Sequence, residues 1–266
     1  MAKRPARDED LPTLSDELSE AFDRTVHEGE FRLGRTLPGL VATGLIGGAD
    51  VSLGVFALLL VKKLTGSEVA GAAAFSIGFI ALTLAKGELF TEDFLVPVAT
   101  VAARRASPAR LARLWGGTLS TNLVAGWLVM GLIVSGFPQL GAPAAKLGAH
   151  YSAIGLGWRS FAGGLLGGAV ITLMTWMQHS TEGVGGRVIA AFIAAFMLAA
   201  APLNHVIVVS LEMFGGLQHG APYGYVDWLT VAAWYTLANI IGGVVLVTGL
   251  RLVQTAPRLG EERGGS

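Results

Sequence analysis

Long apolar runs, each about the length of a membrane crossing, constrain the fold of this chain more than any other feature. A transmembrane helix needs about 20 mostly apolar residues, and only 14% of the 266 residues are charged, against about 25% in soluble domains. Six regions reach the required length: about 38–61, 67–103, 113–136, 156–178, 185–214 and 228–253. The sequence therefore predicts an all-α membrane protein with six transmembrane spans, and it disfavours a soluble enzyme.

Composition and spacing exclude several further functions. The formal net charge is zero, so nothing indicates nucleic acid as a partner. No cysteine is present, which removes disulfides, thiolate metal sites and cysteine nucleophiles. No His and carboxylate pair has metal-ligand spacing, no Ser or Thr has a visible base, and GxSxG is absent. We therefore expect no catalysis, no cofactor and no metal.

Lys and Arg between the apolar regions predict the orientation in the membrane. Basic residues are frequent before the first region, between Arg104 and Arg113, and after the last region, whereas the opposite loops are poor in them. This bias predicts six crossings with both termini in the cytoplasm. We expect a cytoplasmic tail over 1–35 with an amphipathic helix over 15–35 along the inner membrane surface, a transport domain over 36–255, and a frayed cytoplasmic tail over 256–266.

The second and fifth apolar regions are too long for one plain crossing, and each is interrupted by polar residues. The second breaks at "KGE", 86–88, and the fifth at "PLNH", 202–205, where Pro202 disfavours helix before it. Matching breaks in two halves, about 36–137 and 150–255, indicate an inverted repeat around a midplane site. The second region could instead form two short crossings, which the charge bias disfavours, or one crossing plus a surface hairpin.

His205 is the strongest candidate for a functional side chain. It directly follows the break at Pro202, and its neighbours are apolar except Asn204. A neutral imidazole can donate a hydrogen bond to an anion, and its charged form can attract one. A lone histidine in an apolar helix is more often a core residue, but its place beside a break favours a role in transport.

Several motifs of this chain resemble those of the formate/nitrite transporter family. "GELFTED", 87–93, is similar to the family motif Gly-Glu-Leu-Phe-Thr-Glu, and "FSIGF", 75–79, fits the same span. "NHVIVVSLEMF", 204–214, lies where the family has Glu-His followed by Ala-Asn-Met-Phe, and "FAGGLLGG", 161–168, fits a fourth-span pattern. Asn122 and Asn239 match family asparagines in spans three and six. The resemblance covers about 35–255.

The resemblance implies an aquaporin-like fold with one pore in each protomer of a homopentamer, embedded in lipid in the bacterial inner (plasma) membrane. The substrate would be a small monovalent weak-acid anion such as formate, nitrite, lactate or hydrosulfide. It also implies roles for individual residues: Leu89, Phe90 and Thr91 in an inner gate loop, His205 with Asn204 in the central pore, Phe75, Phe79 and Leu198 in an outer constriction, and Asn122 and Asn239 as polar support.

Three carboxylates of the span-two break need a separate explanation, because they would repel an anion. We expect Glu88 to brace the loop by accepting backbone N–H bonds. We expect Glu92 and Asp93 to begin the following helix, whose dipole favours negative charge at that end.

Departures from the family pattern leave the substrate open. Asn204 replaces an acidic residue, Val209 replaces an asparagine, and Gly168 replaces another. The leading interpretation is a channel or proton-linked transporter for a weak-acid anion. The lost polar groups favour an alternative, a channel of the same fold for water or a small neutral solute. A non-transporting membrane scaffold is a third possibility.

Overall fold

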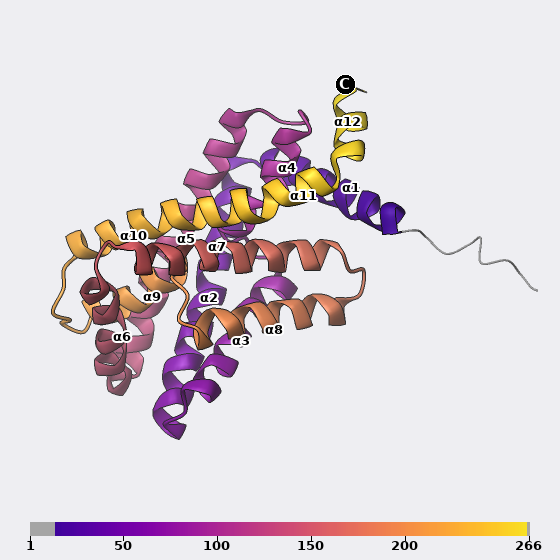
Figure 1. Cartoon of the computed structure of the whole chain (residues 1–266). Coiled ribbons are helices and arrows are strands. Elements are labelled where there is room, and N and C mark those ends of the chain that lie inside the picture. The colour runs from indigo at the N-terminus through magenta and orange to yellow at the C-terminus, as the bar shows by residue number, and fades with distance from the viewer. Residues whose placement is uncertain (1–13, 265–266) are drawn as a thin grey trace, which may run out of the picture.

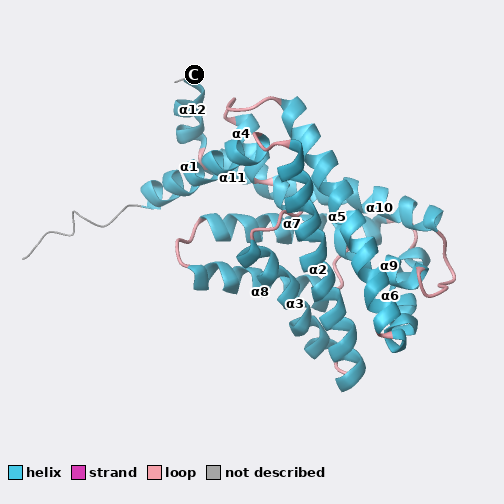
Figure 2. Cartoon of the chain, turned by 180° about the vertical axis from the view of Figure 1, so that it is seen from behind, coloured by secondary structure: helices cyan, strands magenta, loops and turns pink. Residues whose placement is uncertain are grey.

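The computed structural model describes residues 14–264, and this part of the chain consists of helices and loops without a β-strand (Figures 1 and 2). The helices before the middle of the chain are α1 (Leu14–Leu33), α2 (Leu37–Thr65), α3 (Glu68–Ala85), η2 (Glu92–Phe94), α4 (Val96–Ala102), α5 (Pro108–Gly136) and η3 (Pro138–Leu140). The others are α6 (Gly141–Ile154), α7 (Trp158–His179), α8 (Val184–Ala200), α9 (Val206–Leu217), α10 (Tyr225–Ile240), η4 (Ile241–Gly249), α11 (Leu250–Gln254) and α12 (Ala256–Gly264).

Five of these helical segments are long and apolar enough to cross a membrane: α2, α3, α5, α7 and the continuous segment Tyr225–Gln254. They coincide with five of the six predicted regions, which confirms the all-helical membrane class. The remaining region contains α8 and α9, of 17 and 12 residues, which are shorter than a full crossing.

Local sequence signals explain where the long helices begin. The hydroxyls of Thr36, Ser67 and Ser107 each cap a helix by accepting a backbone N–H three residues later. Proline follows in the first turn of both α2 and α5, where no backbone donor is needed. Helix α2 ends at Gly66, which adopts a left-handed conformation with φ of 68°.

Two pairs of membrane helices lie side by side in Figure 1, and the pairs contact each other through α3 and α8. Helix α2 lies along α3 and also contacts α5, while α7 lies along α8 and contacts η4. Small residues allow the first pair to approach closely. A Cβ added to Gly54 would lie 2.7 Å from the carbonyl oxygen of Phe75, so no larger residue fits there without movement.

Both predicted breaks are present. Helix α3 ends at Ala85, and Lys86 turns the chain with a φ of 60° before the short helix η2. Helix α8 ends at Ala200, and irregular backbone leads to α9, which begins at Val206. The polar residues at 86–88 therefore correctly locate the first break, and Pro202 correctly locates the second.

Three features differ from the sequence-based expectations. The loop between the third and fourth regions contains helix α6, which packs on α9. The sixth region contains a π-helical segment, Ile241–Gly249. The expectation of a frayed tail is wrong for 256–264, because α12 packs Leu259 against α1 and Arg258 donates to both oxygens of Asp23 over 2.8 and 2.9 Å.

Candidate functional site

The two helix breaks meet at a hydrogen bond in the interior of the protein. His205 caps the start of α9, Thr91 directly precedes η2, and Nε2 of His205 lies 2.6 Å from Oγ1 of Thr91. Neither side chain has any exposed surface. The contact joins residues that are 114 positions apart, so it depends entirely on the packing of the two halves.

The hydrogen bonds of His205 determine which ring nitrogen carries the proton. The backbone N–H of Val208 donates to Nδ1 over 3.3 Å, so Nδ1 is an acceptor and carries no proton. A neutral imidazole then holds its single proton on Nε2, from where it is donated to Thr91. A second proton on Nδ1 would break the contact with Val208. His205 is therefore arranged as a neutral hydrogen-bond donor.

Asn122 of α5 holds the first break in place. Its Oδ1 accepts the backbone N–H of Phe90 over 2.9 Å. Its Nδ2 donates to the carbonyl oxygens of Glu88, at 2.9 Å, and of Gly44 on α2, at 2.7 Å. Irregular backbone at membrane depth needs such partners, because no lipid group can satisfy it.

Asn239 of α10 holds the second break through the same set of bonds. Its Oδ1 accepts the backbone N–H of Val206 over 2.8 Å. Its Nδ2 donates to the carbonyl oxygens of Asn204, at 2.9 Å, and of Gly164 on α7, at 2.7 Å. Each asparagine thus ties one break to two straight helices by one accepted and two donated bonds.

Apolar side chains surround His205 on the side that faces α8. Phe75 and Phe79 are fully buried with ring centroids 5.6 Å apart, and the Phe79 ring lies 6.4 Å from that of His205. Leu198 of α8 is also buried and lines a cavity beyond them. Of the three residues of the expected outer constriction, Phe79 contacts His205, Phe75 contacts Phe79, and Leu198 lines the larger cavity.

The expected gate residues lie together in the first break but have different surroundings. Leu89 and Phe90 are both buried. The ring of Phe90 packs edge-on against Phe94, at 4.9 Å between centroids, and against Trp115 of α5. Only Thr91 of this set contacts His205 through a side-chain hydrogen bond.

The carboxylates of the first break find cationic partners that sequence reasoning missed. Arg35 donates to the carboxylate of Glu88, and Arg32 of α1 lies 3.4 Å from Oδ1 of Asp93 and 3.7 Å from Oε1 of Glu88. Glu92 instead accepts the backbone N–H of Leu89 over 3.3 Å. We expected Glu88 to brace the loop by accepting backbone N–H bonds, but the structure shows ion pairs with Arg32 and Arg35 instead.

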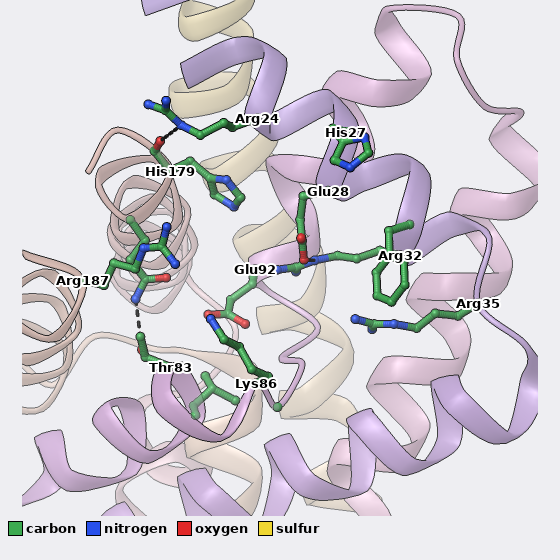
Figure 3. Close-up of a pocket in the computed structure, with 14 residues that line it drawn as sticks. Arg24, His27, Glu28, Arg32, Arg35, Thr83, Lys86, Glu92, His179 and Arg187 are labelled. Atoms are coloured by element: carbon green, nitrogen blue, oxygen red, sulfur yellow. Dashed lines mark hydrogen bonds and ion pairs between the residues drawn. The ribbon is translucent and has the colours of Figure 1, made fainter. Parts of the chain in front are cut away.

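A cavity of about 460 Å³ opens beside these ion pairs (Figure 3). Cationic groups dominate its lining and come from α1, from Lys86 at the end of α3, and from Arg187 of α8. Burial alone would raise the pKa of Glu28 in this cavity, but the Arg32 guanidinium 3.0 Å away lowers the pKa below its usual range. The carboxylate of Glu28 therefore stays charged at neutral pH and positions Arg32.

A larger cavity of about 840 Å³ lies at the other end of α3, where Glu68 and Val69 line it, whereas Leu82 and Thr83 line the smaller cavity. Leu198 and Val208 form part of its wall close to His205, and Lys62 and Lys63 belong to its mouth. His205 packs against Phe79, in the part of α3 between the residues that line the two cavities.

Comparison with known proteins places this arrangement in a family. The profile of the formate/nitrite transporter family matches residues 19–253, and the chain belongs to that family. It is an integral membrane protein, and the proteins it matches are channels and transporters rather than enzymes.

Individual relatives have low sequence identity to this chain, but the alignments cover most of both proteins. The uncharacterized transporter YrhG of Bacillus subtilis (strain 168) is 26% identical over 261 residues, which cover 87% of this chain and 90% of YrhG. The formate channel BtFdhC of Bacillus thuringiensis is 23% identical over 252 residues, which cover 84% and 89%. A solved pentameric formate channel with formate bound superposes with a TM-score of 0.70 at 19% identity, covering 82% of this chain and 97% of that one.

Proposed function

We propose that this protein is a channel or proton-linked transporter for a small monovalent weak-acid anion of the formate or nitrite type. The observation that carries the proposal is the His205–Thr91 contact, which presents one hydrogen-bond donor inside an apolar enclosure between two cavities. A bare anion pays a large desolvation cost in apolar surroundings. A donor at the midpoint lowers that cost for an anion or its acid.

The proposed path follows the order of the described residues. From the side of α1, a solute would leave the smaller cavity and pass the gate loop at Leu89, Phe90 and Thr91. It would meet His205 and then pass Phe79, Phe75 and Leu198 to reach the larger cavity. The excess of cations in the first cavity and the lysines at the mouth of the second favour the collection of anions at both ends.

Fold details that go beyond the helical membrane class also belong to this proposal. We infer six spans, of which α3 with α4 and α8 with α9 each form an interrupted one. The matching bonds of Asn122 and Asn239 support an aquaporin-like inverted repeat, with halves at about 36–137 and 150–255. We also infer cytoplasmic termini over 1–35 and 256–266, a bacterial inner-membrane location, and a homopentamer like the solved formate channel.

One observation favours a second function, a channel for water or a small neutral solute. Asn204 stands where the family has an acidic residue, and its Nδ2 donates to the carbonyl oxygen of Ser160 over 2.8 Å. No charged side chain therefore adjoins the His205 ring within the described part of the chain. A neutral donor without a charged neighbour also suits a polar solute that carries no charge.

Flux into proteoliposomes tests the proposal and separates it from the neutral-solute alternative. Formate, nitrite and a neutral solute of similar size are offered to the parent and to His205→Phe, which removes the donor but keeps an aromatic ring. One lost bond to a charged group is worth about 1.5–3 kcal/mol, so anion flux should fall at least about tenfold. Parent-like anion flux in His205→Phe, or passage of the neutral solute alone in the parent, would contradict the proposal.

The substitution His205→Asn serves as a second variant, because its amide can donate but cannot titrate. If His205 itself supplies a proton to the anion, His205→Asn loses weak-acid flux and keeps neutral-solute passage. If His205 only donates a hydrogen bond, part of the anion flux remains with an unchanged pH profile. The hydrogen bond from Val208 to Nδ1 favours the second outcome.

A further inference from the structure

The larger cavity contains a buried acidic side chain that has no role in the path proposed above. Glu212 of α9 lines this cavity with only 4% of its surface exposed, and its Oε2 lies 2.5 Å from the hydroxyl of Tyr151 on α6. An ionisable group at such depth is costly and is a functional candidate by default.

The mouth of the cavity has the opposite character. Lys62 pairs with Glu68 over 2.7 Å, and Lys63 donates to the carbonyl oxygen of Gln139 over 2.8 Å. Lys146 of α6 is exposed and pairs with no carboxylate in the described part of the chain. The mouth therefore carries more positive than negative charge and collects anions, which an ionised Glu212 deeper inside would repel.

The other titratable groups around Glu212 come from the elements packed on α9. His150 lies on α6 at the exposed rim of the cavity. Tyr223 precedes α10 and donates to the carbonyl oxygen of Met213 over 2.9 Å, while Tyr235 of α10 packs its ring against that of Tyr151. The titratable residues of α5 lie at its opposite end. Tyr151 is thus the one side chain that hydrogen-bonds Glu212 within the described residues.

His205 has no proton to spare for an anion in this arrangement. Its Nδ1 accepts from Val208, and its single proton on Nε2 cannot leave without forming an imidazole anion. If an anion is to cross the apolar residues as its neutral acid, the proton has to come from another group on the path. Glu212 lines the larger cavity together with Leu198 and Val208, two turns along α9 from His205.

We propose that Glu212, held by Tyr151, is a proton-transfer site that neutralises a small carboxylate-like anion before it enters the apolar part of the path. The O–H bond of the Glu212 carboxyl breaks and a new O–H bond forms on the anion, so a neutral acid moves on toward Phe75 and Phe79. The Tyr151 hydroxyl donates to the remaining carboxylate, which then takes up a proton from hydronium in the solution on the side of the larger cavity. One proton then accompanies each anion.

The proposal rests on the anion-transport function proposed above, and one flux experiment separates the two. Formate uptake and internal acidification are measured in proteoliposomes across a range of external pH. Formate uptake by Glu212→Gln at neutral pH should be at least about tenfold slower than uptake by the parent. The residual uptake should rise as the external pH falls, because acidification supplies neutral formic acid in solution. Glu212→Asp, which keeps a titratable carboxyl, should recover part of the uptake. Glu68→Gln, which also neutralises a carboxylate of this cavity but leaves the mouth positive, should lose none of the uptake at neutral pH.

Each outcome has one meaning. If the parent takes up no formate, the anion-transport function fails. If the parent does so and Glu212→Gln matches it in rate and pH profile, only the proton-transfer site is overturned. Loss of ammonium passage in Glu212→Gln with unchanged formate uptake would overturn it in favour of a cation site.

An infrared measurement covers the case in which Glu212→Gln does not fold. Formate added to the parent should weaken a carboxylic acid C=O band, and Tyr151→Phe should shift that band because it removes the hydrogen bond to Glu212. A spectrum without such a band change would overturn the proposal independently of any variant at Glu212.

Discussion

Replacing Asn122 with alanine should destabilise the protein strongly, because two buried backbone groups lose their only partners. The N–H of Phe90 and the carbonyl oxygen of Glu88 are bonded only by this side chain among the described residues. Gly44 keeps the helical bond of α2, so its carbonyl is not left unpaired. An unpaired buried group costs about 1–3 kcal/mol, and the two together predict a loss of about 2–6 kcal/mol in the free energy of unfolding.

The measurement is equilibrium unfolding of the purified protein in detergent, followed by tryptophan fluorescence and circular dichroism. Asn239→Ala should cost a similar amount, since it unpairs the N–H of Val206 and the carbonyl oxygen of Asn204. Thr121→Val is the matched control on the helix of Asn122. Its hydroxyl bonds only carbonyl oxygens of its own helix, so the variant should lose no more than about 1 kcal/mol.

The comparison between Asn122→Ala and Thr121→Val tests whether the first break needs the side chain of Asn122. Equal unfolding curves for the two variants would show that the break is stable without the asparagine. A large loss at Asn122 with none at Asn239 would refute the equivalence of the two breaks, and with it the main support for an inverted repeat.

Three further predictions concern packing, charge and orientation. Gly47→Ala should reduce the free energy of unfolding by about 1–3 kcal/mol or more, because the added Cβ would lie 2.2 Å from the carbonyl oxygen of Glu88 in the first break. Gly116→Ala is the control and should be neutral, because its Cβ would have no atom within 4 Å. Equal unfolding curves for the two variants would contradict the prediction. Arg32→Gln should cost about 3–5 kcal/mol because it leaves the buried carboxylate of Asp93 without its cationic partner, while Glu88 keeps Arg35; parent-like unfolding would argue against the Arg32–Asp93 ion pair. Single cysteines at Ala106 and Gly220 should be labelled from opposite sides of the membrane, and labelling from one side would refute the six-span topology.

Much of the fold follows from local properties of the sequence. Runs of apolar residues are sufficient to identify the membrane helices, because a helix satisfies its own backbone and lipid selects for apolar side chains. Pro202 and the polar residues at 86–88 locate the breaks for an equally local reason, since proline removes a donor and charge is costly in lipid. Helix α6 escaped this reasoning because it is short and contains polar residues.

The partners of the buried polar groups were decided only by the tertiary structure. The sequence shows Glu88 and Asp93 in an apolar region, but not that Arg32 and Arg35 of the preceding segment neutralise them. Likewise it shows Glu212 within an apolar run.

The phenol that meets Glu212 comes from Tyr151, 61 residues earlier on a helix that periodicity did not predict. Hydropathy and helix breaks are properties of neighbouring residues, whereas the satisfaction of a buried charge depends on which distant segments pack together. The sequence by itself therefore determined the all-helical membrane class, five membrane-length helices and the two breaks, and the packing of the helices decided what His205, the carboxylates and Glu212 contact.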